Sequence, residues 1–167
     1  MPPNPHKNYE LLLREHGCSR RVIEHCLAVT ACAQEISKDC PFIDHSLVNA
    51  GAMLHDIGRG NSHSIGHAQA GADLCRTLGF PESVARIVEC HTGAGLTADE
   101  CSLLRLLPRQ CIPETAEERL IAHADNLVAG RRIVTIHDTL ASAIHLNKKV
   151  RRRMYRLALD VEILCHR

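Results

Sequence analysis

The sequence predicts an all-α protein, folded as a single-domain bundle of six to eight helices. Apolar residues recur at helical spacing along the chain, and no segment shows the clear alternation of a half-buried strand. Capping residues, glycines and prolines divide the chain into segments of helical length. A length of 167 residues is close to that of one ordinary domain and allows a sizeable core.

The same signals give the expected bounds of each helix. The first helix is expected at Tyr9–His16 and is closed by Gly17. The second is expected from Arg20 to about Lys38, capped by Ser19 and broken by Cys40-Pro41. The third is expected from the cap Asp44 to about Asp56 and is ended by Gly58 and Gly60. After a polar loop, the next are expected at His67–Leu78, ended by Gly79, and at Glu82–Cys90, with Pro81 at the first turn. The last are expected at about 98–107 and 116–129, behind the capping boxes Thr97-x-x-Glu100 and Thr115-x-x-Glu118, and from the cap Asn147 to about Cys165.

Charge and composition exclude several classes of protein. Twenty Lys and Arg residues oppose nineteen Asp and Glu residues, and this balance excludes a strongly basic nucleic-acid coat and an acidic tail protein. Two Tyr, two Phe and no Trp require an aliphatic core, whereas twelve His and nine Cys are potential metal ligands. The cysteines are odd in number and lack a C-x-x-C pair, so we expect reduced, structural thiols.

Neither a targeting signal nor a membrane span is expected. The stretch Met1–Glu10 is polar and rich in proline, and it lacks the apolar centre of a signal peptide. No apolar run approaches the roughly 18 residues of a membrane span. We therefore expect a soluble, cytoplasmic protein without a membrane partner.

The doublet His55-Asp56 is the central chemical feature of the sequence. It ends an apolar helix, and neighbouring helical positions lie about 100° apart, so imidazole and carboxylate can reach one cation below the helix end. A second doublet, His137-Asp138, lies in a less regular stretch without a glycine turn behind it. We interpret this second doublet as solvent-exposed or as a helix start, with Asp138 a candidate cap.

Two further residues make the doublet informative. His25 lies on the apolar face of the long early helix, where a lone His is more often a satisfied core residue than a ligand. Asp125 lies within an apolar helical pattern, where a carboxylate is costly unless it is paired or bound to metal. Two imidazoles and two carboxylates on three helices would satisfy one another through one divalent cation.

These residues form the pattern H…HD…D, and the chain resembles the HD-domain superfamily of metal-dependent phosphohydrolases, in particular its HDIG branch. The tetrapeptide His55-Asp56-Ile57-Gly58 is intact. The resemblance covers a core of about residues 20–130 and leaves a C-terminal helical tail at 131–167 within the same single domain, 1–167. It implies a helical bundle of the HD-domain type that hydrolyses phosphomonoesters, nucleotides or phosphodiesters with bound divalent metals.

An extended, two-metal version of the resemblance adds His67 and His91 as ligands. It implies that Asp56 bridges the two ions, with His67 and His91 on the second ion. Nitrogen and carboxylate ligands suit first-row ions, so we expect one or two ions of Mn, Fe, Co, Ni or Zn. Asp56 and His55 are then the catalytic residues, because the ions that they hold would activate a water for in-line attack on phosphorus.

Three side chains are candidates for binding the substrate phosphate. Arg59 directly follows the HDIG tetrapeptide, where relatives often carry Lys, and Arg21 lies one turn before His25. The plain interpretation of either arginine is a surface residue. His63 stands four residues before His67, so the two share a face if that segment is helical; it is a metal ligand, a phosphate ligand or a loop residue in water.

The function that we expect is hydrolysis of a phosphate ester of a small phosphorylated compound, with a nucleotide favoured. A single His91 without a following Gly-Tyr-Pro departs from the cyclic-dinucleotide phosphodiesterase branch, and the chain is too short for the large dNTP triphosphohydrolase branch. The alternatives are a phosphodiesterase acting on cyclic phosphates or RNA ends, and a non-catalytic module that binds nucleotide or metal.

The C-terminal tail is basic. Its cations are Lys148, Lys149, Arg151, Arg152, Arg153 and Arg156. Apolar residues follow them and aromatics for base stacking are not interleaved, so we interpret the tail as a solvated helix face and do not expect a nucleic-acid partner. The oligomeric state is left open.

Overall fold

A computed structural model describes residues 8–165 of the chain. Residues 1–7, which belong to the stretch expected to lack a targeting signal, and residues 166–167 lie outside the described residues. The secondary-structure elements of the described part are all helices apart from one small two-stranded hairpin, so the predicted all-α class is confirmed.

Nine α-helices, one 3-10 turn and two short strands follow one another in residues 8–165. They are α1 (Tyr9–Glu15), α2 (Arg20–Ser37), α3 (His45–Leu54), η1 (Ile57–Gly60), α4 (His67–Thr77), α5 (Glu82–Cys90), α6 (Ala98–Leu103), α7 (Ala116–Asn126), β1 (Val128–Ala129), β2 (Arg132–Ile133), α8 (Ile136–Ser142) and α9 (Lys148–Cys165). The strands pair antiparallel, with Val128 opposite Ile133 and Ala129 opposite Arg132.

The predicted capping residues begin their helices as expected. Ser19 and Asp44 accept hydrogen bonds from backbone N–H groups of the first turns of α2 and α3. Thr97 forms a complete capping box with Glu100 at α6. Asn147 accepts from the backbone N–H of Lys149 at 2.8 Å, which satisfies one of the free donors at the start of α9.

The second capping box is only half formed. Thr115 accepts from the backbone N–H of Glu118, but the Glu118 carboxylate accepts from the backbone N–H of Glu114 at 2.7 Å rather than from that of Thr115. The carboxylate therefore still satisfies a backbone donor beside the start of α7, one residue earlier than predicted.

The expected bounds fail at two helix ends. The helix expected to reach residue 107 stops at Leu103, because the chain turns through Arg105, which has a positive φ of 59°. The helix expected to reach residue 129 stops at Asn126, and Val128 and Ala129 join the hairpin instead.

One more helix is present among the described residues than the six to eight expected. The additional helix, α8, contains the second doublet, His137-Asp138, in its first turn, and both residues are exposed, so both interpretations of the doublet hold. The assignment of Asp138 as a candidate cap was wrong: Thr135 is the cap, and Asp138 is the acidic partner that completes its capping box.

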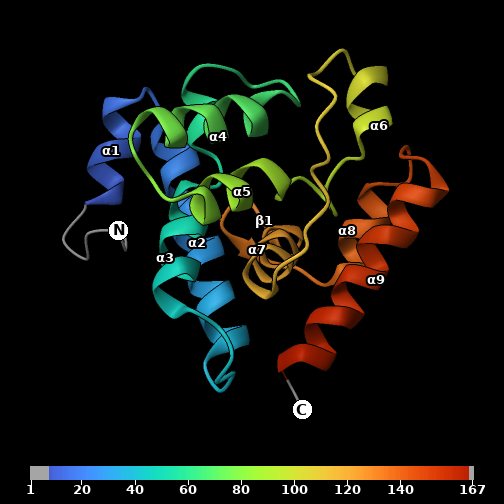
Figure 1. The fold of residues 1–167 in the computed structure, drawn as a ribbon. Coiled ribbons are helices and arrows are strands. Elements are labelled where there is room, and N and C mark those ends of the chain that lie inside the picture. The colour runs from blue at the N-terminus through green and yellow to red at the C-terminus, as the bar shows by residue number, and fades with distance from the viewer. Residues whose placement is uncertain (1–7, 166–167) are drawn as a thin grey trace.

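Two aliphatic clusters flank the centre of the bundle. One joins α2, α3, α5, α7 and α9 through side chains such as Val29, Leu120 and Leu157. The other joins α1, α2, α3, α4 and α5 through side chains such as Leu13 and Leu54. In Figure 1, α1 and α9 lie at opposite edges, with α2, α5 and α7 between them. None of the helices in residues 8–165 combines the length and the hydrophobicity that crossing a membrane requires.

Candidate metal centre

Six side chains converge where five helices meet. They are His25 from α2, His55 and Asp56 directly after α3, His67 at the start of α4, His91 directly after α5 and Asp125 from the last turn of α7. All six residues predicted as metal ligands thus lie in one cluster, although they are up to 100 residues apart in the sequence.

The 3-10 turn η1 sets how closely α3 and α4 approach. A Cβ atom at Gly58 would overlap the carbonyl oxygen of His67 and would lie 2.8 Å from the backbone nitrogen of Gly71. Only glycine allows the turn to pass this close to α4. The glycine of the tetrapeptide therefore holds Asp56 and His67 within reach of each other.

Asp56 lies at the centre of one half of the cluster. Its Oδ1 atom is 3.1 Å from Nε2 of His67 and 3.5 Å from Nε2 of His91. The two imidazole Nε2 atoms are 3.2 Å apart. His55 approaches from the other side, with its Nε2 atom 3.8 Å from Oδ2 of Asp56.

Asp125 lies in the other half. Its Oδ1 atom is 2.9 Å from Nε2 of His25 and 3.6 Å from Nε2 of His55. His55 thus faces both carboxylates. Ligand atoms of His25, His55 and Asp125 lie within 4.8 Å of one another, and so do those of His55, Asp56 and His91, which gives two adjoining groups that could each hold a metal ion.

The four imidazole rings share one hydrogen-bonding pattern. Each Nδ1 atom lies 2.7 or 2.8 Å from a backbone carbonyl oxygen; the acceptors are Gly130 for His25, Ala52 for His55, Ser64 for His67 and Val88 for His91. A carbonyl oxygen only accepts, so each Nδ1 carries the hydrogen. In the neutral ring Nε2 then has a free lone pair, and all four lone pairs face the two carboxylates.

These polar groups cannot satisfy one another by hydrogen bonding alone. The lone pair of His67 Nε2 faces that of His91 Nε2, and the buried atoms His55 Nε2 and Asp56 Oδ1 have no hydrogen-bond partner among the described residues. Buried polar atoms without partners are costly. A cation among them would satisfy the facing lone pairs, so the residues fit a divalent metal ion.

The electrostatics agree with this fit. Burial acts to raise the pKa of Asp56 and of Asp125, but the positive charge that the facing imidazoles can carry outweighs burial and holds the pKa of both carboxyls well below their usual range, so both are ionised. Burial lowers the pKa of His91 and so favours its neutral ring. Burial also opposes a charge on His55, yet the acidic groups beside it raise its pKa. The surroundings of His55 Nε2 therefore attract a cation.

The three predicted phosphate-binding side chains lie around one hollow. Arg59, Arg21 and His63 line a cavity of about 330 Å³ that also contains Asp56. Arg59 is not free, because its Nε atom donates to Oδ2 of Asp56 at 2.7 Å. Arg21 and His63 are exposed. His63 lies in irregular backbone before α4, so it does not share a helix face with His67.

A larger hollow of about 810 Å³ adjoins the other half of the cluster. It is lined by His25, Arg59 and Asp125, and beyond them by the hairpin and α8. Sequence reasoning missed its outer wall, which includes Asn126, Arg132, Thr135, Asp138, Thr139 and Ser142. Neither strand had been predicted, and two-residue strands carry no periodic signal that could have revealed them.

The helical bundle and the H…HD…D pattern are those of a known class of protein. The family model of the HD domain matches residues 22–130 of the chain. The chain therefore belongs to the HD domain family. This confirms the predicted superfamily, whose members are generally hydrolases that bind divalent metals. Assignment to the HDIG branch stays a prediction.

Several relatives are similar over most of this chain. An uncharacterized protein of Methanocaldococcus jannaschii is 46% identical over 134 residues, which are 78% of this chain and 79% of that protein. A tRNA (cytidine(56)-2'-O)-methyltransferase of Picrophilus torridus is 41% identical over 75% of this chain, and one of Thermoplasma volcanium is 46% identical over 71%. The matches span only 37% and 35% of the two methyltransferases.

A more distant relative is named as a ribonuclease. Ribonuclease Y of Acidothermus cellulolyticus is 36% identical over 53% of this chain and 15% of its own length. No solved structure matches the chain significantly.

Proposed function

We propose that the protein is a metal-dependent phosphohydrolase of the HDIG branch that cleaves a phosphate ester of a small phosphorylated compound, with a nucleotide as the favoured substrate. Membership of the HD domain family supports hydrolysis dependent on divalent metal. The observation that carries the proposal is the cluster of four inward-facing Nε2 atoms around the carboxylates of Asp56 and Asp125.

The proposed ligands divide between two neighbouring positions. One ion would be held by His25, His55, Asp56 and Asp125, and a second by Asp56, His67 and His91. Such nitrogen and oxygen donors suit Mn, Fe, Co, Ni or Zn. When bound, these ions supply Lewis acidity and a water that is activated near neutral pH.

The side chains of the protein orient and charge this centre. The Nδ1 hydrogen bonds to backbone carbonyls fix each ring, so no rotation is needed to present Nε2. Arg59 holds Oδ2 of Asp56 with its Nε atom, and its terminal nitrogens form no hydrogen bond with the described residues. We assign those nitrogens, together with Arg21 and His63, to the substrate phosphate.

The dimensions of the larger hollow support a small-molecule substrate. Its volume of about 810 Å³ lies within the range of roughly 300–1,000 Å³ that small-molecule sites have. It reaches from His25 and Asp125 to Arg132, so a phosphate at the cluster would leave space for the rest of a nucleotide.

A second candidate function is a phosphodiesterase that acts on cyclic phosphates or RNA ends. The names of three relatives favour it, because two are tRNA methyltransferases and one is a ribonuclease. The same metal centre would serve this reaction, and only the shape of the substrate would differ.

The proposal is tested by restoring metals to metal-free protein. Release of p-nitrophenol is measured from p-nitrophenyl phosphate and from bis-p-nitrophenyl phosphate with Mn²⁺, Co²⁺, Ni²⁺ or Zn²⁺. We expect metal-dependent hydrolysis of the monoester that Asp56→Asn and Asp125→Asn abolish. His45→Gln is the matched control, because His45 is an exposed histidine at the far end of α3.

Each other outcome selects a different function. Faster cleavage of the diester than of the monoester would favour the phosphodiesterase. Metal binding without hydrolysis of either ester, or of a panel of nucleotides, would leave the non-catalytic binding module. Hydrolysis that persists in Asp56→Asn would contradict the metal centre itself.

A further inference from the structure

The first half of α9 presents a line of cations to solvent. Lys148, Arg152 and Arg156 stand four residues apart, so they share a helix face and follow one another at intervals of about 6 Å. All three are exposed, and no carboxylate of the described residues forms an ion pair with any of them. Residues 148–156 therefore form a positive ridge about 12 Å long.

A neighbouring arginine shows what a structural cation on this helix looks like. Arg153 donates to Oε2 of Glu100 at 2.7 Å and to the backbone oxygen of Gly95 at 2.8 Å, which ties α9 to the start of α6. The ridge cations have no such bonds. Like charges four residues apart repel each other on a helix, so the ridge lowers the stability of α9 without a compensating contact in the protein.

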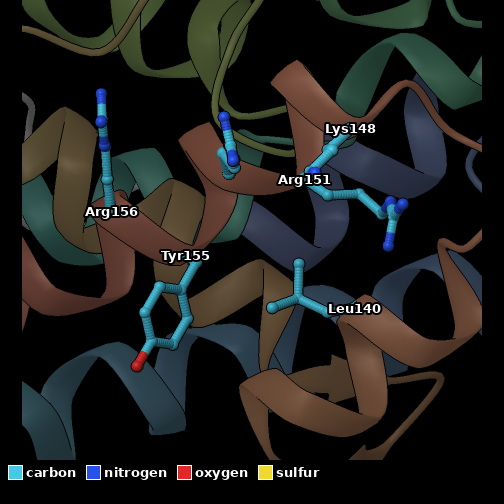
Figure 2. Close-up of a pocket in the computed structure, with 6 residues that line it drawn as sticks. Leu140, Lys148, Arg151, Tyr155 and Arg156 are labelled. Carbon is cyan, nitrogen blue, oxygen red and sulfur yellow. The ribbon is translucent and has the colours of Figure 1, made fainter.

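The ridge separates two hollows. Lys148, Arg152 and Arg156 line both of them, one of about 640 Å³ and the other of about 550 Å³. The larger hollow is completed by Arg151 and Tyr155 from α9 and by Leu140 from α8, as Figure 2 shows. A line of charge with open space on both sides suits an extended polyanion better than a single phosphate group.

Tyr155 adds an aromatic surface to the positive ridge. Its side chain is 41% exposed, and its ring lies 6.2 Å from that of His137 on α8. Sequence reasoning interpreted the tail as lacking aromatics among its cations, but Tyr155 lies in the hollow with Arg151 and Arg156. An exposed ring beside phosphate-binding cations is the arrangement on which nucleic-acid bases stack.

We propose that the first half of α9 binds a single-stranded oligonucleotide, with phosphates along Lys148, Arg152 and Arg156 and a base stacked on Tyr155. The site does not involve the metal cluster, so the proposal stands or falls independently of the proposed function. It reverses the expectation that the tail is only a solvated helix face.

An anionic membrane is a weaker candidate for the same face. Beyond Arg156 the exposed residues of α9 include Asp160 and Glu162. A membrane surface lying along the helix would repel these carboxylates, whereas a short oligonucleotide needs only the first half of the helix. The two hollows also provide concave space that a flat lipid surface would leave empty.

The test is fluorescence anisotropy of the full chain with fluorescein-labelled RNA and DNA oligonucleotides of twelve residues. We expect saturable binding. A plot of the logarithm of the affinity against the logarithm of the salt concentration should have a slope of about −2, the value for about three neutralised phosphates on a single strand. The triple variant Lys148→Gln, Arg152→Gln, Arg156→Gln should bind at least about tenfold more weakly, with a slope near zero. RNA and DNA arms separate recognition of the 2′-hydroxyl from recognition of phosphate and base alone.

A matched triple variant controls for net charge. Arg14→Gln, Arg20→Gln and Lys38→Gln remove three exposed cations from α1, from the start of α2 and from the residue after α2. The affinity of this triple variant for the oligonucleotide should match that of the wild type. Tyr155→Leu should weaken binding at least about fivefold, and Tyr155→Phe should restore it. The ridge variant should melt at or above the wild-type temperature, because repulsion within α9 is relieved.

Four results would overturn the proposal. The first two are the absence of saturable binding to either oligonucleotide, and an equal loss of affinity in the ridge variant and the control variant. The third is stronger binding to phosphatidylserine vesicles than to oligonucleotides. The fourth is displacement of the oligonucleotide by inorganic polyphosphate of equal charge, together with full affinity in Tyr155→Leu. The last result would reduce the ridge to a general polyanion site.

Discussion

At the scale of single residues, backbone carbonyl groups decide the chemistry of the cluster. The hydrogen bond from Nδ1 to a carbonyl selects the tautomer of each of the four imidazoles and leaves Nε2 free for an ion. Sequence patterns predicted the ring-bearing residues, because histidine and aspartate stand out on apolar faces. They did not predict the acceptors, because any residue type can supply a carbonyl oxygen.

Substitution of Arg59 is expected to separate substrate binding from metal binding. Arg59→Gln should lower kcat/KM for a phosphate ester about 10- to 150-fold, since a hydrogen bond to a charged group contributes roughly 1.5–3 kcal/mol. The metal content of the variant should stay close to that of the wild type, because Arg59 contacts Asp56 but is not itself a ligand.

The measurement is steady-state kinetics of Arg59→Gln, Arg59→Lys and the control His45→Gln, combined with metal analysis of each protein. Arg59→Lys should recover part of the activity, since a point charge replaces a forked donor. A value of kcat/KM within twofold of the wild type in Arg59→Gln would remove Arg59 from the substrate site.

At the scale of elements, the contact between η1 and α4 is too close to admit a side chain at Gly58. Gly58→Ala should destabilise the protein by about 1–3 kcal/mol, because the new Cβ atom forces the turn away from α4. It should also weaken metal binding, since His67 moves with α4 while Asp56 moves with the turn.

Chemical denaturation and metal titration of Gly58→Ala check this prediction. Gly79→Asn is the control, because Gly79 also lies in a tight turn, with φ of 76°, but nothing lies within 4 Å of its Cβ position. Wild-type stability together with wild-type metal affinity in Gly58→Ala would show that the close approach is not needed.

A charge network between α4 and α5 makes stability depend on pH. Hydrogen bonds from Arg109 and Arg76 hold the pKa of Asp73 below its usual range. A carboxyl whose pKa is lowered by folding stabilises the protein above its unfolded pKa of about 3.9 and loses that contribution as the pH falls through the folded pKa. Asp73→Asn should therefore be less stable than the wild type near pH 6, and the difference should vanish toward pH 2.

Urea denaturation of both proteins across this pH range is the measurement. The difference in free energy of unfolding should be modest, because the Asp73 side chain is half exposed. A difference that grows as the pH falls would contradict the assigned direction of the pKa shift.

The sequence predicted helix starts better than helix ends. Ser19, Asp44, Thr97 and Asn147 cap helices as expected, because a side-chain oxygen beside free N–H groups is a local interaction. The end of α6 at Leu103 depends on a positive φ at Arg105, a residue type that rarely adopts it. No local signal marks such a turn.

The hairpin was missed for a related reason. Its two strands have two residues each, and it packs beside α2 and α7, which only the folded chain brings there. The structure brings together all six predicted histidine and aspartate residues, whose role as metal ligands stays a prediction, whereas the hairpin wall of the larger hollow was not predicted. Under the proposed function, substrate choice would depend on the part of the site that the sequence patterns reveal least.

At the scale of the whole molecule, α9 is packed into the same core as the motif-bearing helices. Leu157 is buried in the cluster that contains Val29 of α2 and Leu120 of α7. We expect the core at 20–130 and the tail at 131–167 to unfold together, as one domain. Leu157→Ala should lower the free energy of unfolding by about 2–5 kcal/mol.

Calorimetry and circular dichroism of Leu157→Ala check this expectation. One transition should shift as a whole to lower temperature, with coincident curves from both methods. Two transitions, of which the substitution moves only one, would mean that the tail forms a separate unit.

The proposed function requires the six-residue cluster to be a metal centre. Titration calorimetry of the metal-free protein with Mn²⁺, Co²⁺, Ni²⁺ and Zn²⁺ tests it most directly. We predict saturable binding of one or two ions per chain, weakened at least about tenfold in Asp56→Asn and in Asp125→Asn but unchanged in His45→Gln. The absence of saturable binding of any of these ions, or equal binding by all four proteins, would contradict the claim.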